Sequence, residues 1–226
     1  MEDALRSAEK PGRLRVGASM TIGSQFLPDY VKAITAKLPG AEVLAAVGPS
    51  RMLEERLLAN SLDLALLEGV PSSELLLTEE YMEDSLAVIC PPELPFKPGR
   101  PLGLEEFRRQ KFLLRERGSG AREEFERVIA GAGISVSPSW EAMSTTALVN
   151  AVISGLGISV LPERMIRGAA RRGLVKVVSV EGLSFTRSFR IVRHRDKYLT
   201  PLALEFMELC RSYGREHPEP EYEGLY

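Results

Sequence analysis

The fold is decided by one stretch near the start of the chain, Gly12-Arg13-Leu14-Arg15-Val16-Gly17-Ala18-Ser19-Met20-Thr21-Ile22-Gly23. Its apolar residues predict a buried strand, and the hydroxyls of Ser19 and Thr21 follow at a turn. Apolar side chains then recur at helical spacing at Ile22, Phe26, Leu27, Tyr30, Val31, Ile34 and Leu38. The first turn of a helix has unpaired N–H donors and the positive end of the helix dipole, so it suits an anion or a carboxylate. The stretch therefore predicts a strand–turn–helix unit that binds a small molecule.

Composition excludes several classes of function. The 226 residues include 29 basic and 31 acidic side chains, which gives a formal charge of −2 and no sign of nucleic-acid binding. Cys90 and Cys210, and His194 and His217, lack the spacing of a metal site, so neither a metal nor a cofactor is expected. The chain has no apolar run of membrane-spanning length and no secretory signal at its N-terminus. We therefore expect a cytoplasmic protein that does not enter a membrane.

Strand and helix segments alternate along the chain, which predicts an α/β architecture with mostly parallel strands. In the first half we expect strands at 13–18, 42–47, 62–67 and 85–90, and helices at 25–38 and 50–60. In the second half we expect strands at 111–115, 137–141, 158–161, 175–180 and 188–193, and helices at 104–109, after Gly120, at 144–154 and at 200–212. The acidic residues at 79–80 and 83–84 suggest solvated turns.

Four motifs, taken in their order and spacing, carry a family resemblance. They are Gly-Arg-Leu-Arg-Val-Gly-Ala-Ser at 12–19, Leu-Asp-Leu-Ala-Leu at 62–66, Leu-Arg-Glu-Arg-Gly-Ser-Gly-Ala-Arg at 114–122 and Ala-Val-Ile-Ser-Gly-Leu-Gly-Ile-Ser-Val-Leu-Pro at 151–162. From Gly12 to about Tyr213 the chain resembles the effector-binding domain of LysR-type transcriptional regulators. The resemblance implies a two-lobed fold like that of type 2 periplasmic binding proteins, in which each lobe is a mostly parallel sheet flanked by helices.

The same resemblance implies how the chain is divided. Residues 13–90 and 181–213 would form lobe I and residues 91–180 lobe II, with crossings near Cys90-Pro91 and Val180-Glu181. Residues 1–12 resemble the end of a linker helix, and residues 214–226 would be a mobile tail. DNA would be bound only through a winged helix-turn-helix, for which the residues before Arg13 are too few. Self-association as a homodimer or tetramer is also implied, here through the helix at 50–60 and its partner in lobe II. The helix at 50–60 carries a wide apolar stripe of Met52, Leu53, Leu57 and Leu58.

The family's effector positions fall on a defined set of residues in this sequence. They are Ser19, Met20 and Thr21 in the first turn, Glu68 and Gly69 after the third strand, Ser119 in its Gly-Ser-Gly turn, and Met143, Ser144 and Thr145. The implied ligand is a small effector, anionic or a carboxylate, in the cleft between the lobes. Glu68 would repel an anion unless it is protonated or faces an amine. Each Ser and Thr could instead cap a helix, and the methionines could simply pack.

Catalytic alternatives lack their motifs. The Gly118-Ser119-Gly120 turn does not have the G-x-S-x-G spacing of a nucleophile elbow, and the sequence contains no G-x-x-x-x-G-K-[ST] phosphate loop. We therefore do not expect an enzyme. The alternative that stays open is a free-standing solute-binding protein of the same fold.

Overall fold

The computed structural model describes residues 12–96 and 99–216. These residues form two compact units, which are described one at a time. Unit 1 contains residues 12–82 and 189–216, and unit 2 contains residues 83–96 and 99–188. The linker-helix expectation for the first residues and the tail expectation beyond residue 216 lie outside the described residues.

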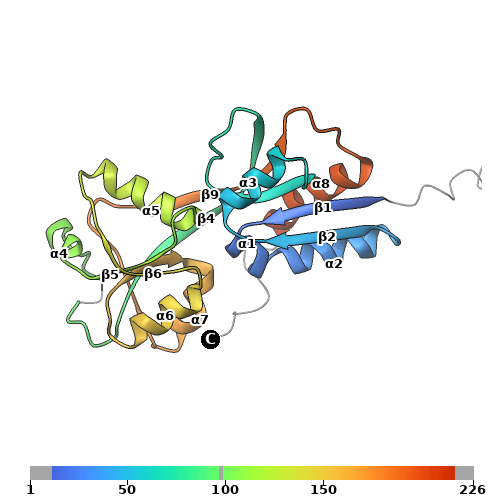
Figure 1. Ribbon diagram of the computed structural model, residues 1–226. Coiled ribbons are helices and arrows are strands. Elements are labelled where there is room, and N and C mark those ends of the chain that lie inside the picture. The colour runs from blue at the N-terminus through green and yellow to red at the C-terminus, as the bar shows by residue number, and fades with distance from the viewer. Residues whose placement is uncertain (1–11, 97–98, 217–226) are drawn as a thin grey trace, which may run out of the picture. The chain divides into compact units, whose positions relative to one another are not determined.

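Unit 1 is built on a sheet in the order β2-β1-β3-β9. The strands are β1 (Arg13–Ala18), β2 (Glu42–Val47), β3 (Leu64–Glu68) and β9 (Thr186–His194) from Phe189 onward. Beside β9 lies β4 (Leu76–Cys90), which belongs to unit 1 up to Met82. β1 runs parallel to both β2 and β3, so the carboxyl ends of these three strands meet at one edge of the sheet (Figure 1). β9 runs antiparallel to β3.

Four helices pack on this sheet, α1 (Met20–Gln25), α2 (Leu27–Lys37), α3 (Ser50–Leu58) and α8 (Pro201–Glu216). The single helix expected at 25–38 is wrong in its start, because helical structure begins at Met20 and is interrupted at Phe26. Pro28 explains the interruption, since it has no N–H to donate to a carbonyl in the preceding turn and fits only at the beginning of a helix.

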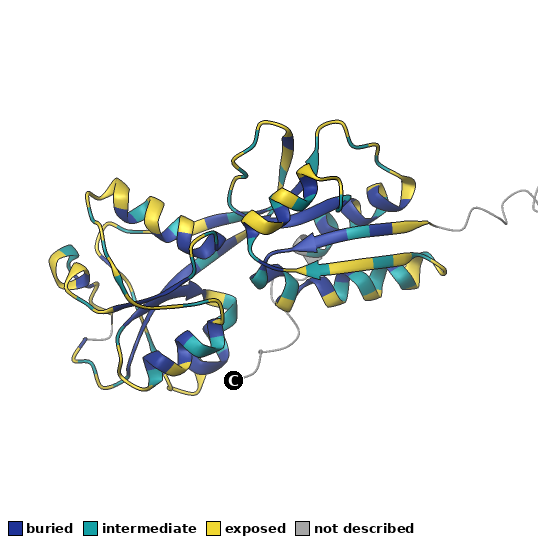
Figure 2. Cartoon of the chain, in the orientation of Figure 1, coloured by how far each residue is buried: buried dark blue, intermediate teal, exposed yellow. Residues whose placement is uncertain are grey.

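β3 is buried on both faces, and its alternating side chains join two apolar clusters. One face packs with α1, α2 and α8 in a cluster that contains Phe26 and Phe189, whose ring centroids are 5.8 Å apart. The other face packs with Leu53 and Leu57 of α3. Figure 2 shows the contrast with β2, whose residues are exposed or only half-buried. Of the apolar residues of α3, Leu53 and Leu57 enter the core, whereas Met52 and Leu58 are exposed.

Unit 2 contains the remaining strands in two sheets. β4 (Leu76–Cys90), from Glu83 onward, pairs antiparallel with β7 (Ser159–Pro162) and β8 (Lys176–Val178). β5 (Phe112–Arg115) and β6 (Pro138–Ala142) form a parallel pair. The side chains of β4 between Leu86 and Cys90 alternate between two buried clusters, as expected for a strand covered on both faces.

The helices of unit 2 are α4 (Leu104–Arg108), α5 (Gly120–Gly131), α6 (Thr145–Ile153) and α7 (Glu163–Arg171). The first three match the expected helices closely. α7 was not expected; it buries Ile166 and the small residues Gly168 and Ala169.

The chain passes between the units within two unbroken strands. The passages fall at 82/83 in β4 and at 188/189 in β9, eight residues away from the expected positions near Cys90-Pro91 and Val180-Glu181. Pro91 and Pro92 mark the end of β4, whereas the strand passes from unit 1 to unit 2 in its middle. Among the described residues, no helix has both the length and the apolar character needed to cross a membrane.

Candidate functional site

In unit 1, polar side chains gather where three parallel strands end. Ser19 follows β1 directly, Ser50 begins α3 after β2, and Glu68 is the last residue of β3. The backbone fixes this edge, since the Ser19 N–H donates to the Leu66 carbonyl at 2.9 Å and the Gly48 N–H donates to the Ala18 carbonyl at 3.1 Å. Ligands of open α/β sheets bind outside the carboxyl ends of the strands, so this edge is the candidate site of unit 1.

Glu68 lies at the N-terminus of α1 and interacts with two of the predicted residues. Its side chain is buried, and its Oε1 accepts hydrogen bonds from the Ser19 hydroxyl at 2.8 Å and from the Thr21 N–H at 2.9 Å. A carboxylate of the chain itself therefore occupies the place where the sequence predicted an anion from outside. Ser19 does not cap α1 with its side chain, and Gly69 turns the chain away at a φ of +93°.

Ser50 belongs to the same edge and was missed as a site residue, because a serine at the start of an expected helix is ordinarily a cap. It is 4% exposed, it makes no capping bond to α3, and its Oγ has no hydrogen-bond partner among the described residues. A buried hydroxyl without a partner is costly and usually has a reason. Its position after the second of three parallel strands was the signal that could have found it.

Unit 2 has an equivalent edge at the ends of β5 and β6, where Arg115 is in register with Ala142. Ser119 is the N-cap residue of α5 and is 4% exposed, but its side chain makes no capping bond. Ser144 does cap α6, because its Oγ accepts a hydrogen bond from the Ala147 N–H at 3.2 Å. The capping interpretation thus holds for Ser144 and not for Ser119.

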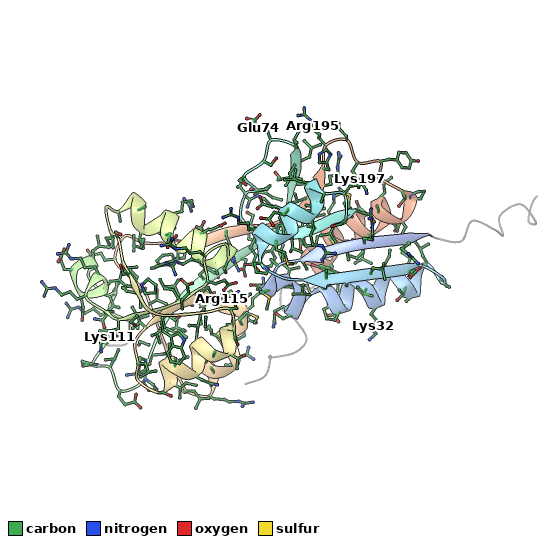
Figure 3. The ribbon with its side chains drawn as sticks, viewed as in Figure 1. Lys32, Glu74, Lys111, Arg115, Arg195 and Lys197 are labelled. Carbon is green, nitrogen blue, oxygen red and sulfur yellow. The ribbon has the colours of Figure 1, made fainter. Side chains whose placement is uncertain are left out.

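Arg115 is the central charge of this edge and was not among the predicted residues (Figure 3). Its guanidinium is buried, donates to the Thr145 hydroxyl at 3.3 Å and forms two hydrogen bonds to the Glu116 carboxylate at 2.8 and 2.9 Å. Arg122 supports it from α5, donating to the Arg115 carbonyl at 3.0 Å. An arginine that ends an apolar strand was the available signal, since a core strand has little other use for a charge.

The two methionines of the predicted set differ in their surroundings. Met143 is 60% exposed, so a structural packing role does not account for it, whereas Met20 is half-buried in the first turn of α1. The structure therefore gathers the predicted residues into two groups, one in each unit. The unit 1 group offers hydroxyls and a carboxylate, and the unit 2 group offers hydroxyls and a guanidinium.

The profile described as LysR substrate binding domain matches residues 7–215. The chain belongs to this family. It is 30% identical to the uncharacterized HTH-type transcriptional regulator YeiE of Escherichia coli (strain K12), over 89% of this chain and 69% of that protein. It is also 32% identical to the phosphonates import ATP-binding protein PhnC of Anaeromyxobacter dehalogenans, over 89% of this chain but only 41% of that protein. The chain thus spans between two fifths and about two thirds of these relatives.

Among solved structures, the regulatory domain of CcmR from Synechocystis PCC6803, in complex with 2-PG, is similar to this LysR substrate-binding domain. The TM-score is 0.82 at 22% identity, over 91% of this chain and 99% of that one. The likeness confirms the expected fold class, an α/β fold of the type 2 periplasmic-binding-protein kind. The family assignment also identifies a ligand-binding domain of transcriptional regulators and not an enzyme, and it does not favour the free-standing solute-binding alternative.

Proposed function

We propose that this LysR substrate-binding domain senses a small effector through the strand-end groups of both units. In unit 1 the contact residues would be Ser19, Met20, Thr21, Glu68 and Gly69, with Ser50 added to the predicted set. In unit 2 they would be Ser119, Met143, Ser144 and Thr145, with Arg115 behind them. The observation that carries the proposal is the buried Ser50 hydroxyl, which has no hydrogen-bond partner among the described residues.

The charges of the two groups suggest what the effector looks like. Glu68 already occupies the α1 N-terminus, so an anionic group is disfavoured there and a hydroxyl or amino donor is favoured. The N-termini of α5 and α6 favour a carboxylate or phosphate in unit 2, whereas the Arg115 guanidinium behind them is already paired with the Glu116 carboxylate. The effector would thus be a small carboxylate or phosphorylated acid that also carries a donor.

The wider function follows from the relatives and is also part of the proposal. YeiE is named as an HTH-type transcriptional regulator, and this chain corresponds to 69% of it. Effector binding by this domain would control DNA binding by a winged helix-turn-helix region that lies outside this chain. The regulator would act in the cytoplasm as a homodimer or tetramer.

A ligand screen followed by paired variants tests the proposal. Thermal shift of the domain against hydroxy acids, amino acids, phosphorylated acids and phosphonates identifies the effector. Ser50→Ala should then weaken binding about two- to tenfold, the value of one neutral hydrogen bond, without lowering the melting temperature. The melting temperature should stay unchanged because Ser50→Ala removes a buried hydroxyl that has no hydrogen-bond partner among the described residues. Ser119→Ala in unit 2 should weaken binding to a similar degree.

Ser212→Ala is the matched control, since its hydroxyl bonds within its own helix to the Leu209 carbonyl at 3.1 Å. It should leave the dissociation constant unchanged. The proposal fails if Ser50→Ala and Ser119→Ala both bind the effector as tightly as the unmodified domain. An effect confined to the variant of one unit would refute joint binding by the two groups.

A further inference from the structure

Unit 1 contains a hollow of about 470 Å³ that the proposed effector groups do not use. It lies between one face of the sheet, at β4 and β9, and one side of α8. Leu77 and Glu79 of β4 are two residues apart, so both point to the same face of the sheet. The same alternation places Ile191 and Arg193 of β9 on one face. The volume lies in the range of small-molecule sites.

The hollow has an apolar floor and apolar sides. Ile191 and Met207 are buried and belong to the main core of unit 1. Leu77 and Leu204 line the same hollow but stay 44% and 51% exposed. Among the described residues that line it, no side chain carries an aromatic ring. Exposed leucines beside a buried apolar floor mark a binding surface, and here their shape suits an aliphatic chain and not a stacked ring.

Two guanidinium groups line the hollow, and they differ in their partners. Arg211 donates to the Glu79 carboxylate at 2.8 Å and to the Glu208 carboxylate at 2.9 Å. Arg193 is half-buried and makes no hydrogen bond or ion pair with any residue that the structure describes. The bonds from Arg211, and after them the charge of Arg193, lower the pKa of Glu79. Glu79 is thus a carboxylate bound by Arg211, and the N–H donors of Arg193 stay available to a ligand.

We propose that this hollow is a second ligand site, specific for a medium-chain aliphatic carboxylate. The acyl chain would lie along Leu77, Leu204 and Met207, and the carboxylate would accept hydrogen bonds from the Arg193 guanidinium. Burial of methylene groups supplies the first contribution, and pairing of the carboxylate with the guanidinium supplies the second. An alkylamine would be repelled by Arg193, and an uncharged chain would leave the guanidinium without a partner.

Ligand-observed NMR of the domain with hexanoate, octanoate and 1-octanol tests this proposal. Octanoate should show saturable binding. Hexanoate should bind about four- to sixteenfold more weakly, because each buried methylene contributes about a factor of two to four. 1-Octanol keeps the chain and loses the charge, and it should bind about tenfold more weakly than octanoate because a charged hydrogen bond is lost.

Two pairs of variants complete the experiment. Arg193→Gln should weaken octanoate about tenfold and leave 1-octanol unchanged, again the value of a charged hydrogen bond. Arg195→Gln, at an exposed position outside the hollow, is its matched control and should change neither compound. Leu204→Gln should weaken both compounds, because it removes apolar surface at an exposed position. Leu156→Gln is the control in unit 2, 47% exposed, and should change neither.

Several results would overturn the proposal. One is the absence of saturable octanoate binding, and another is equal binding of octanoate and 1-octanol. Octanoate binding that survives Arg193→Gln and is lost in Ser50→Ala would assign the acid to the proposed effector groups instead. A lower molar mass of Leu204→Gln in light scattering, without octanoate binding to the unmodified domain, would assign the exposed leucines to a contact between two copies of the chain.

Discussion

Asp63 should make the stability of unit 1 depend on pH in a defined acidic window. Its carboxylate accepts from the Arg15 backbone N–H at 2.7 Å and from the Arg15 guanidinium at 2.7 Å, and it pairs with the Lys197 ammonium at 2.7 Å. Burial by itself would raise the pKa of Asp63. The bonds from Arg15 and Lys197 outweigh burial and lower the pKa to about 2.

The size and sign of the effect follow by linkage. The difference between the ordinary pKa of 3.8 and a folded-state pKa of about 2 corresponds to about 2.4 kcal/mol. Because the side chain keeps 17% of its exposure, solvent screening reduces the expected contribution to about 1–2 kcal/mol. A lowered pKa stabilises the fold above the unfolded value. This stabilisation is therefore complete above about pH 5 and is lost as the pH falls through 4 toward 2.

Urea unfolding of the domain, followed by circular dichroism between pH 6 and the acid limit of folding, measures the contribution. The difference in unfolding free energy between the unmodified domain and Asp63→Asn should shrink as the pH falls below 4. Asp196→Asn is the matched control, since that side chain is 80% exposed, and its difference should stay flat. If the Asp63→Asn curve runs parallel to that of the unmodified domain at every pH, the ion-pair reasoning is refuted.

Two further pairs of variants test the packing and the caps. Gly157→Ala should lower the unfolding free energy by about 1–3 kcal/mol, because a Cβ would lie 2.3 Å from the Lys111 carbonyl oxygen. Gly131→Ala, in an open helical position, should raise the unfolding free energy by up to about 1 kcal/mol. Equal effects of the two variants in chemical denaturation would contradict both expectations. Ser144→Ala should cost about 1 kcal/mol in the same assay because it removes the α6 cap, whereas Ser119→Ala removes no capping bond and should cost less.

The parallel strands of both units were predictable because their signals are local. Apolar runs bounded by turns place β1 and β2 correctly to the residue, and α3 and α6 to within two residues of their ends. The start of β4 was not predictable in this way. Residues 79–84 place a pair of acidic side chains on either side of Tyr81 and Met82 and suggest solvated turns, but the strand continues through them.

The reason lies in partners that are distant in the sequence. Glu79 pairs with Arg211 of α8, Glu80 with Arg190 and Asp84 with Arg187 of β9, over separations of more than a hundred residues. Taken alone, these acidic residues indicate an exposed turn. They fit within a strand because the fold places a basic partner beside each of them. The sequence shows both residues of each ion pair but does not show which acidic residue contacts which basic residue.

The candidate site shows the same limit at the scale of single hydroxyls. The sequence located Ser19, Ser119 and Ser144 after strands, where Ser is ambiguous between a cap and a ligand contact. Only geometry separates them, because Ser144 bonds its own helix and Ser19 bonds Glu68. Arg115 and Ser50 were not predicted as site residues, because an arginine at the end of a strand and a serine at the start of a helix are both common in their local context.

The position of Glu68 resolves the conflict that its charge posed at the level of sequence. A carboxylate beside an anion site is repulsive only if it is free to face the anion, and here one oxygen is committed to the Ser19 hydroxyl and the Thr21 N–H. These bonds turn the α1 N-terminus from an anion site into a support that holds an acceptor at the strand edge. The helix N-termini of the two units are thus not equivalent: in unit 1 the positive end is used internally, and in unit 2 it stands beside the Arg115 guanidinium. An effector that binds both groups, as proposed, would therefore carry two different polar ends: a hydrogen-bond donor for the unit 1 group and an acidic group for the unit 2 group.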